Sequence, residues 1–157
     1  MIVLARVDDR LVHGQVAVGW KNALDANHLA VIDDHIASDM FERSLLEMSV
    51  PYELELSIFS TEDAIRELPK FVHDPGLRSI ILVKNPQIFI PLLESGIDLT
   101  EVNIGGMRFA KGKEQITKAV FLNAEERETV KQLSARGIII DWRIVPTDKR
   151  GDYLTQL

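Results

Sequence analysis

The chain has 157 residues and 46% of them are hydrophobic, which suits one domain with a single substantial core. Its 18 Lys and Arg against 24 Asp and Glu give a formal net charge of −6, so no overall positive field attracts nucleic acid or anionic lipid. The chain has no cysteine, which excludes disulfides and thiolate sites. Its apolar runs are too short for a signal peptide or a membrane span, so we expect a cytoplasmic protein.

Strand-like and helix-like patterns alternate from the N-terminus onward. Residues 2–7 are almost continuously apolar, which predicts a strand covered on both faces. Residues 14–24 repeat apolar side chains at helical spacing. A helix over 36–48 is predicted by an apolar stripe of Ile36, Met40, Phe41, Leu45 and Met48. Further strands are predicted at 28–32, 52–59, 79–83, 101–104, 118–122 and 137–145, and further helices over 60–68, 85–96 and 123–137, with a short last helix from Pro146.

This alternation decides the expected fold class. Strands that alternate with helices are joined by right-handed crossovers and form a largely parallel sheet. No repeat, linker or low-complexity segment interrupts the pattern. We therefore predict a single α/β domain over residues 1–157, with an open, twisted, mainly parallel sheet and helices on both faces. Because Met1 stands at the start of the first strand, we also expect a free subunit rather than part of a fusion.

A polar cluster, "RVDDRLVHGQV" at residues 6–16, joins the first strand to the first helix. Ligands of open α/β sheets bind beyond the carboxyl ends of the strands, which is where this cluster should lie. If the helix begins near Gly14, the free backbone N–H groups of Gly14, Gln15 and Val16 form an anion site. The positive end of the helix also favours the neutral, nucleophilic form of the His13 imidazole, which can attack phosphorus.

The charged residues of the cluster suit the same chemistry. Arg10 is a planar cation that can bind two phosphoryl oxygens at once, and Arg6 can add positive charge during transfer. Either Asp8 or Asp9 can accept the N–H of the other imidazole nitrogen and fix the tautomer. Gly14 lets the backbone approach a phosphate. The mixture predicts a phosphohistidine site.

Other interpretations stay open at this stage. A histidine in such a loop is most often a solvated surface residue, and Arg10 with Asp9 can be a surface ion pair worth at most about 1 kcal/mol. The loop can also belong to a binding module that holds a phosphorylated ligand without forming a covalent bond. A third possibility is an acid–base enzyme that uses His13 with Asp9.

A second stretch, "NIGGM" at 103–107, places two glycines after a strand. The pair Gly105 and Gly106 forms either a tight turn or a place where backbone amides approach an anion. The basic residues Arg108, Lys111 and Lys113 follow, and can form a patch that attracts an acidic partner. The four histidines are scattered, and neither a dinucleotide fingerprint nor a Walker loop occurs, so we expect no metal and no bound cofactor.

The segment "RVDDRLVHGQV" strongly resembles the phosphorylation-site segment of the IIB components of the mannose, fructose and sorbose family of the phosphoenolpyruvate-dependent sugar phosphotransferase system. The resemblance extends along the chain, with "VIDDHIASD", "VNIGGM" and "WRIVPTD" at places where the family has similar segments. Other IIB families of this system use cysteine, which this chain lacks. Asp33 departs from the pattern, because the family often has a neutral amide there, and Asp34 is expected mainly to cap its helix.

The resemblance implies a phosphoryl carrier that has a covalent phosphohistidine intermediate. His13 would accept the group from a phosphohistidine of the IIA partner, at Nδ1, and pass it to a sugar carried inward by the membrane subunits IIC and IID. Arg10 and Arg6 match basic residues near the phosphate. From the residues and the resemblance together, the expected catalytic residues are His13, Arg10 and Asp9, and the expected phosphate-binding residues are Arg6, Gly14, Gln15, Gly105 and Gly106.

Overall fold

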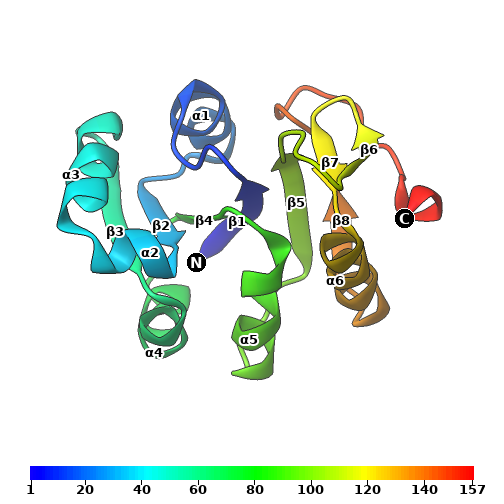
Figure 1. Ribbon diagram of the computed structural model, residues 1–157. Coiled ribbons are helices and arrows are strands. Elements are labelled where there is room, and N and C mark those ends of the chain that lie inside the picture. The colour runs from blue at the N-terminus through cyan, green and yellow to red at the C-terminus, as the bar shows by residue number, and fades with distance from the viewer.

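The computed structural model describes residues 1–157 and contains a six-stranded parallel sheet with strand order β3-β2-β4-β1-β5-β8 (Figure 1). Its strands are β1 (Ile2–Asp8), β2 (His28–Ile32), β3 (Glu55–Phe59), β4 (Ser79–Val83), β5 (Glu101–Gly106) and β8 (Ile139–Asp141). The remaining strands, β6 (Glu114–Thr117) and β7 (Val120–Leu122), form a separate antiparallel hairpin. The predicted fold class, an open and mainly parallel α/β sheet, is confirmed.

Helices cover both faces of the sheet. One face carries η1 (Gln15–Trp20) and α1 (Lys21–Leu24). The other face carries α4 (Thr61–Val72), η2 (Pro86–Ile88), α5 (Phe89–Glu94) and α6 (Ala124–Ala135). The helices α2 (Asp34–Ser38) and α3 (Met40–Ser49) lie beside β3, and η3 (Leu154–Gln156) ends the chain. No helix is long and apolar enough to cross a membrane.

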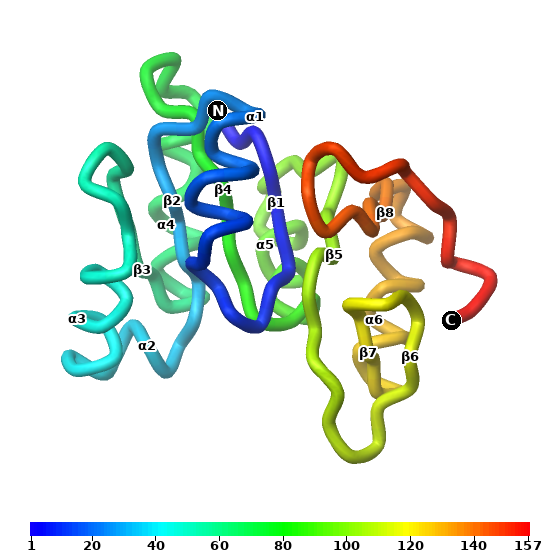
Figure 2. Tube along the Cα trace, turned by 90° about the horizontal axis from the view of Figure 1, so that it is seen from above, coloured from blue at the N-terminus to red at the C-terminus, as the bar shows by residue number.

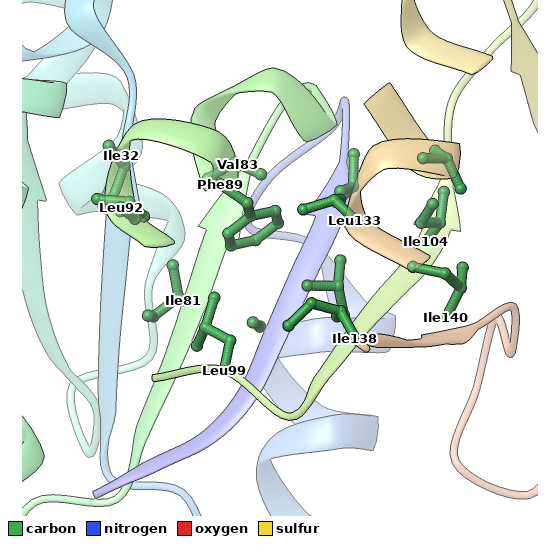
Figure 3. Packing of buried hydrophobic residues seen from close by; sticks show 14 of the residues in the cluster. Ile32, Ile81, Val83, Phe89, Leu92, Leu99, Ile104, Leu133, Ile138 and Ile140 are labelled. Atoms are coloured by element: carbon green, nitrogen blue, oxygen red, sulfur yellow. The ribbon is translucent and has the colours of Figure 1, made fainter. Parts of the chain in front are cut away.

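Alternation along the buried strands divides the core in two. In β4, Ile81 and Val83 point into the larger cluster, which packs Phe89 and Leu133 from the helices (Figure 3). Their neighbours Ile80 and Leu82 point to the other face and pack against Trp20. Successive side chains of a strand face opposite sides, so the run of four apolar residues in β4, from Ile80 to Val83, fills both layers.

The strand order creates a switch point at β1. From β1 the chain crosses over β4 to reach β2 on one side. On the other side of β1 lies β5, which leads on to β8 at the opposite edge. In such sheets, ligands bind where the connections diverge. Figure 2 shows the loop after β1 at the same end of the molecule as α2, α3 and the β6–β7 hairpin.

The boundaries of several elements differ from the sequence prediction. The β6 strand was not predicted, residues 52–54 form a turn before β3, and β8 ends at Asp141, so that residues 142–145 and Pro146 belong to a loop. The predicted helix over 36–48 is wrong as one element. The side chain of Asp39 accepts hydrogen bonds from the first amides of α3, and its extended backbone ends α2. A good capping residue competes with helix continuation at that point.

After this break, the predicted apolar side of α3 does not meet the core. Ile36 on α2 is buried as predicted, but Met40, Phe41, Leu45 and Met48 on α3 are exposed. The α3 helix has no buried residue and contacts the core through partly buried Leu46 and Val50 just beyond its end. The apolar stripe therefore faces solvent.

Candidate phosphoacceptor site

The loop after β1 is anchored from below and leaves its polar residues on the surface. The backbone N–H of Asp9 donates to the Gly106 carbonyl at 3.0 Å, which extends the pairing of β1 with β5. Leu11 adopts a positive φ of 54°, an uncommon conformation outside glycine, and its side chain and that of Val12 are buried. The turn is thus fixed by two apolar side chains, while Arg10 and Gly14 stay exposed and His13 is partly exposed.

The helix that follows opens with unpaired amides. The N–H groups of Val16 and Ala17 both donate to the His13 carbonyl, at 3.0 and 2.8 Å. The N–H groups of residues 12–15 donate to no protein acceptor. Val16 was expected among the free amides and is not, but Gly14 and Gln15 are, together with the two residues before them. Four free donors in one short segment form a place that an anion can occupy.

The His13 ring is held by Asp8. Its Nε2 lies 2.7 Å from Oδ2 of Asp8, which is completely buried, while the His13 side chain is 16% exposed. An ionised carboxylate only accepts hydrogen bonds, so Nε2 donates, and in the neutral ring Nδ1 therefore carries the free electron pair. No protein group bonds to Nδ1. The choice between Asp8 and Asp9, which the sequence left open, falls on Asp8.

Asp8 stays ionised in spite of its burial. Burial by itself raises the pKa of this carboxyl, but the hydrogen bond from His13 and the positive charge of Arg6 outweigh it, so the pKa of Asp8 lies below its usual value. Arg6 donates from Nη2 to Oδ2 at 2.9 Å. On the other oxygen, Oδ1 accepts the backbone N–H of Arg10 at 3.1 Å. The carboxylate is therefore a fixed acceptor for several donors at once.

Arg6 does not lie where a phosphate ligand would need to be. Its side chain is fully buried, bonded to Asp8 and to the Oδ1 of Asn103. The two glycines expected to bind phosphate, Gly105 and Gly106, belong to β5 rather than to a turn, and both are buried. A Cβ at Gly105 would overlap the Arg6 guanidinium, and one at Gly106 would lie 3.2 Å from the Asp8 carboxylate. These glycines make room for the buried ion pair, so their expected role is corrected.

Deeper residues that sequence reasoning missed complete this network. Asn103 donates through Nδ2 to Asp141 at 3.0 Å and to the Arg143 carbonyl at 2.9 Å. The Arg143 guanidinium pairs with Asp141 at 3.0 Å and lies over the Trp20 ring, 5.2 Å from its centroid. The sequence signal for Asn103 was a polar residue in a buried strand, beside the two glycines. Apart from Nε of Arg6, which has no partner, the polar side chains of this network are hydrogen-bonded to one another, and such pairing gives them one geometry.

Arg10 is the exposed cation of the site. Its Nη2 donates to Oε1 of Gln15 at 3.0 Å, and its Nε lies 3.5 Å from Oδ1 of Asp8. With a side chain 43% exposed, the guanidinium stands at the rim of the loop. Gln15 thus orients Arg10 with its side chain, while its backbone N–H is one of the free donors. A Cβ at Gly14 would meet no atom within 4 Å, so the loop itself does not require glycine there.

Asp9 does not contact His13. Its Oδ2 accepts the backbone N–H of Arg108 at 2.8 Å and the Arg108 Nε at 3.2 Å, so it joins this loop to the segment after β5. The expected catalytic role of Asp9 is therefore corrected to a role in holding two loops together. Of the acidic residues after β2, Asp33 caps α2, while Asp34 binds the N–H and hydroxyl of Thr61 at the start of α4. No three His, Asp or Glu side chains gather where they could hold a metal ion.

Fold and site together define a class: open parallel α/β domains that present a histidine, held by a buried carboxylate, at the carboxyl end of the first strand. Residues 2–157 match the family model described as the sorbose subfamily IIB component of the phosphotransferase system (PTS). The chain belongs to this family and is thereby a phosphotransfer component of sugar transport.

Similar proteins span the chain. The sorbose-specific EIIB component of Lacticaseibacillus casei is 35% identical over 100% of this chain and 95% of that protein. The mannose-specific EIIAB component of Escherichia coli is 37% identical, over 96% of this chain and 46% of that longer protein. The crystal structure of the N-acetylgalactosamine-specific IIB component 1 from Escherichia coli superposes with a TM-score of 0.90 at 33% identity, covering 97% of this chain and 99% of that one.

Proposed function

We propose that His13 is the phosphoacceptor of this chain: it takes a phosphoryl group from a phosphohistidine of a IIA partner and passes it to a sugar carried by the membrane subunits IIC and IID. The observation that carries the proposal is the 2.7 Å contact between His13 Nε2 and Asp8, which leaves the electron pair of Nδ1 free. A neutral imidazole nitrogen is a competent nucleophile toward phosphorus.

In the first step, Nδ1 of His13 attacks the phosphorus, the bond from phosphorus to the donor ring breaks, and the donor ring leaves with that electron pair. No proton has to move, because Nε2 of His13 keeps its hydrogen throughout. Phosphorylation makes the His13 ring cationic, and the Asp8 carboxylate stabilises that charge. Asp8 is a positioning residue in this scheme, and the buried Arg6 guanidinium holds the Asp8 carboxylate in place through its ion pair.

The transferred group spreads negative charge over its equatorial oxygens. The free N–H groups of residues 12–15 and the guanidinium of Arg10 supply donors and positive charge on the exposed side of the loop. In the second step, a sugar hydroxyl attacks phosphorus, the bond from phosphorus to Nδ1 breaks, and the hydroxyl proton is released to the surroundings. We assign the chain no metal and no cofactor, and association with the membrane through its partner subunits only.

The test is a phosphorylation assay with mass spectrometry. Incubated with phosphoenolpyruvate, the general phosphotransferase proteins and the cognate IIA, the chain gains an acid-labile phosphate, and His13→Ala does not. His35→Ala is the matched control, because His35 is exposed and lies outside the loop. Phosphorus NMR of the product assigns Nδ1 or Nε2. An unmodified wild-type chain, beside IIA that is demonstrably phosphorylated, contradicts the proposal.

A further inference from the structure

The α3 helix carries an apolar surface that nothing in the chain covers. Its members, which we call the α3 face, are Met40, Phe41, Leu45 and Met48 on the helix and Tyr52 just after it. Met40 and Met48 are each 84% exposed, Phe41 is 70% exposed and Tyr52 is 95% exposed. Helical spacing places the first four on one side. A gathering of large exposed apolar side chains marks an interaction site.

A groove links the α3 face to the loop of His13. A hollow of about 420 Å³ lies between them, with Leu45 and Leu46 of α3 on one wall and Arg10, Leu11 and Val12 of the loop on the other. Figure 2 shows both elements at one end of the molecule. A protein that brings its own reacting group into line with His13 therefore lies next to Leu45 and can cover the rest of the face.

The charge of the groove favours one of the successive partners. The groove is lined by three cations, Arg10, Lys84 and Arg108, and by two carboxylates, Asp9 and Glu42, in a chain whose net charge is −6. Arg10 and Lys84 also pair with Asp8 and Asp33, but these carboxylates are only 0% and 14% exposed, so the cations are the partners that face solvent. This excess of cations is a property of the unphosphorylated chain. In that state the incoming partner still carries the phosphoryl group, which has close to two negative charges. A phosphorylated donor therefore complements this groove, whereas the acceptor subunits meet a loop whose cations already face a phosphate.

The composition of the face suits an encounter that forms and breaks in each cycle. Methionine side chains are flexible and polarisable, so they repack on a partner surface without a fixed geometry. Aromatic side chains such as Phe41 and Tyr52 supply contact area at low entropic cost. We propose that the α3 face is the docking surface for the phosphodonor protein, IIA, and that it positions the donor's phosphohistidine over His13. This inference rests on the proposed function.

The experiment compares two routes to the same phosphohistidine in the full chain. The double variant Phe41→Glu with Met48→Glu places two charges on the face without touching a buried side chain. With phosphorylated IIA as the donor, kcat/KM falls by about tenfold or more, mainly through KM, because charges replace apolar contacts at an interface. With phosphoramidate, a small phosphodonor that needs no docking, the rate of His13 phosphorylation equals that of wild type.

The matched control is Ile139→Glu. Ile139 is 57% exposed and begins β8, at the end of the sheet away from the His13 loop. It should leave both rates unchanged. A double variant that accepts phosphate from IIA as well as wild type overturns the inference, and so does one that loses the phosphoramidate reaction to the same extent.

Two further outcomes would name another occupant and reject IIA. If the double variant slows transfer only to sugar in vesicles that contain the membrane subunits, the face docks those subunits. If wild type sediments as a dimer, the double variant as a monomer, and transfer from IIA is equal, the face pairs two copies of this chain. Failure of wild type to accept phosphate from either donor would instead reject the proposed function itself.

Discussion

The guanidinium of Arg6 lies so close to the backbone of Gly105 that a Cβ there would overlap its Cζ and both terminal nitrogens. A strand glycine therefore provides the space for a buried arginine, and that arginine pairs with the carboxylate that holds His13. This chain of contacts connects a residue of β5 with the chemistry at the end of β1.

Gly105→Ala should be strongly destabilising. The methyl group must displace Arg6 from Asp8, and breaking a buried ion pair costs about 3–5 kcal/mol. Urea unfolding measures the loss. Gly14→Ala is the control, because its Cβ meets no atom within 4 Å and its backbone is already helical. That variant should unfold within about 0.5 kcal/mol of wild type. Equal stability of the two variants would contradict the role given to Gly105.

Asp8→Asn should slow phosphorylation of His13. Asp8 accepts on both oxygens, from Arg6 and His13 on one and from Arg10 on the other, so either orientation of the amide sets an NH₂ against a donor. The ring then loses its fixed tautomer, and we expect a fall on the order of a hundredfold in the rate. Nitrogen NMR of the His13 ring shows the change of tautomer independently of turnover. A wild-type ring spectrum together with a wild-type rate would reject the positioning role.

Arg10→Ala should slow the transfer on the order of a hundredfold and leave the stability nearly unchanged. The guanidinium is at the rim and supports charge on the phosphoryl group rather than the core. Stopped reactions with phosphorylated IIA measure the rate. Arg10→Lys keeps the charge but loses the forked geometry, so an intermediate rate is expected. Gln15→Leu removes the hydrogen-bond partner of Arg10 and should have a smaller effect of the same sign. Unchanged kinetics in a folded Arg10→Ala protein would remove the role of Arg10.

His28 should make the fold sensitive to mild acid. It is buried between the hydroxyls of Ser79 and Ser57, at 2.8 and 2.9 Å, and burial lowers the pKa of its imidazole. Below about pH 6.5 His28 binds a proton in the unfolded chain but not in the folded chain. The free energy of unfolding therefore falls as the pH decreases. Above that pH the imidazole is neutral in both states, and the stability that the buried, neutral His28 contributes is fully present.

Urea unfolding of wild type and His28→Gln at pH 7.5 and pH 5.5 measures this effect. The glutamine variant has no group to titrate at this position, so its stability should decrease less between the two pH values than that of wild type. An equal decrease in both proteins would show that other groups cause the acid sensitivity.

The strands and the position of the His13 loop could be predicted from the sequence. Buried parallel strands are continuous apolar runs, so β2 and β4 were predicted to the residue. The position of His13 followed from the rule that sites lie beyond the carboxyl ends of strands, and Asn123 with Glu126 marked the start of α6 by its capping box. In the β6–β7 hairpin, β7 lies within the strand predicted at 118–122, but β6 was missed because Ile116 is its only apolar residue.

The sequence by itself determined the alternation of strands and helices, and the place where a histidine, an arginine and two aspartates come together, because these depend on local pattern and neighbours in the chain. Only the tertiary structure decided which aspartate holds His13, that Arg6 with Gly105 lies beneath the site, and that the apolar side of α3 faces solvent. Each of these depends on residues distant in sequence that meet through packing between strands and helices, and local periodicity does not encode such contacts.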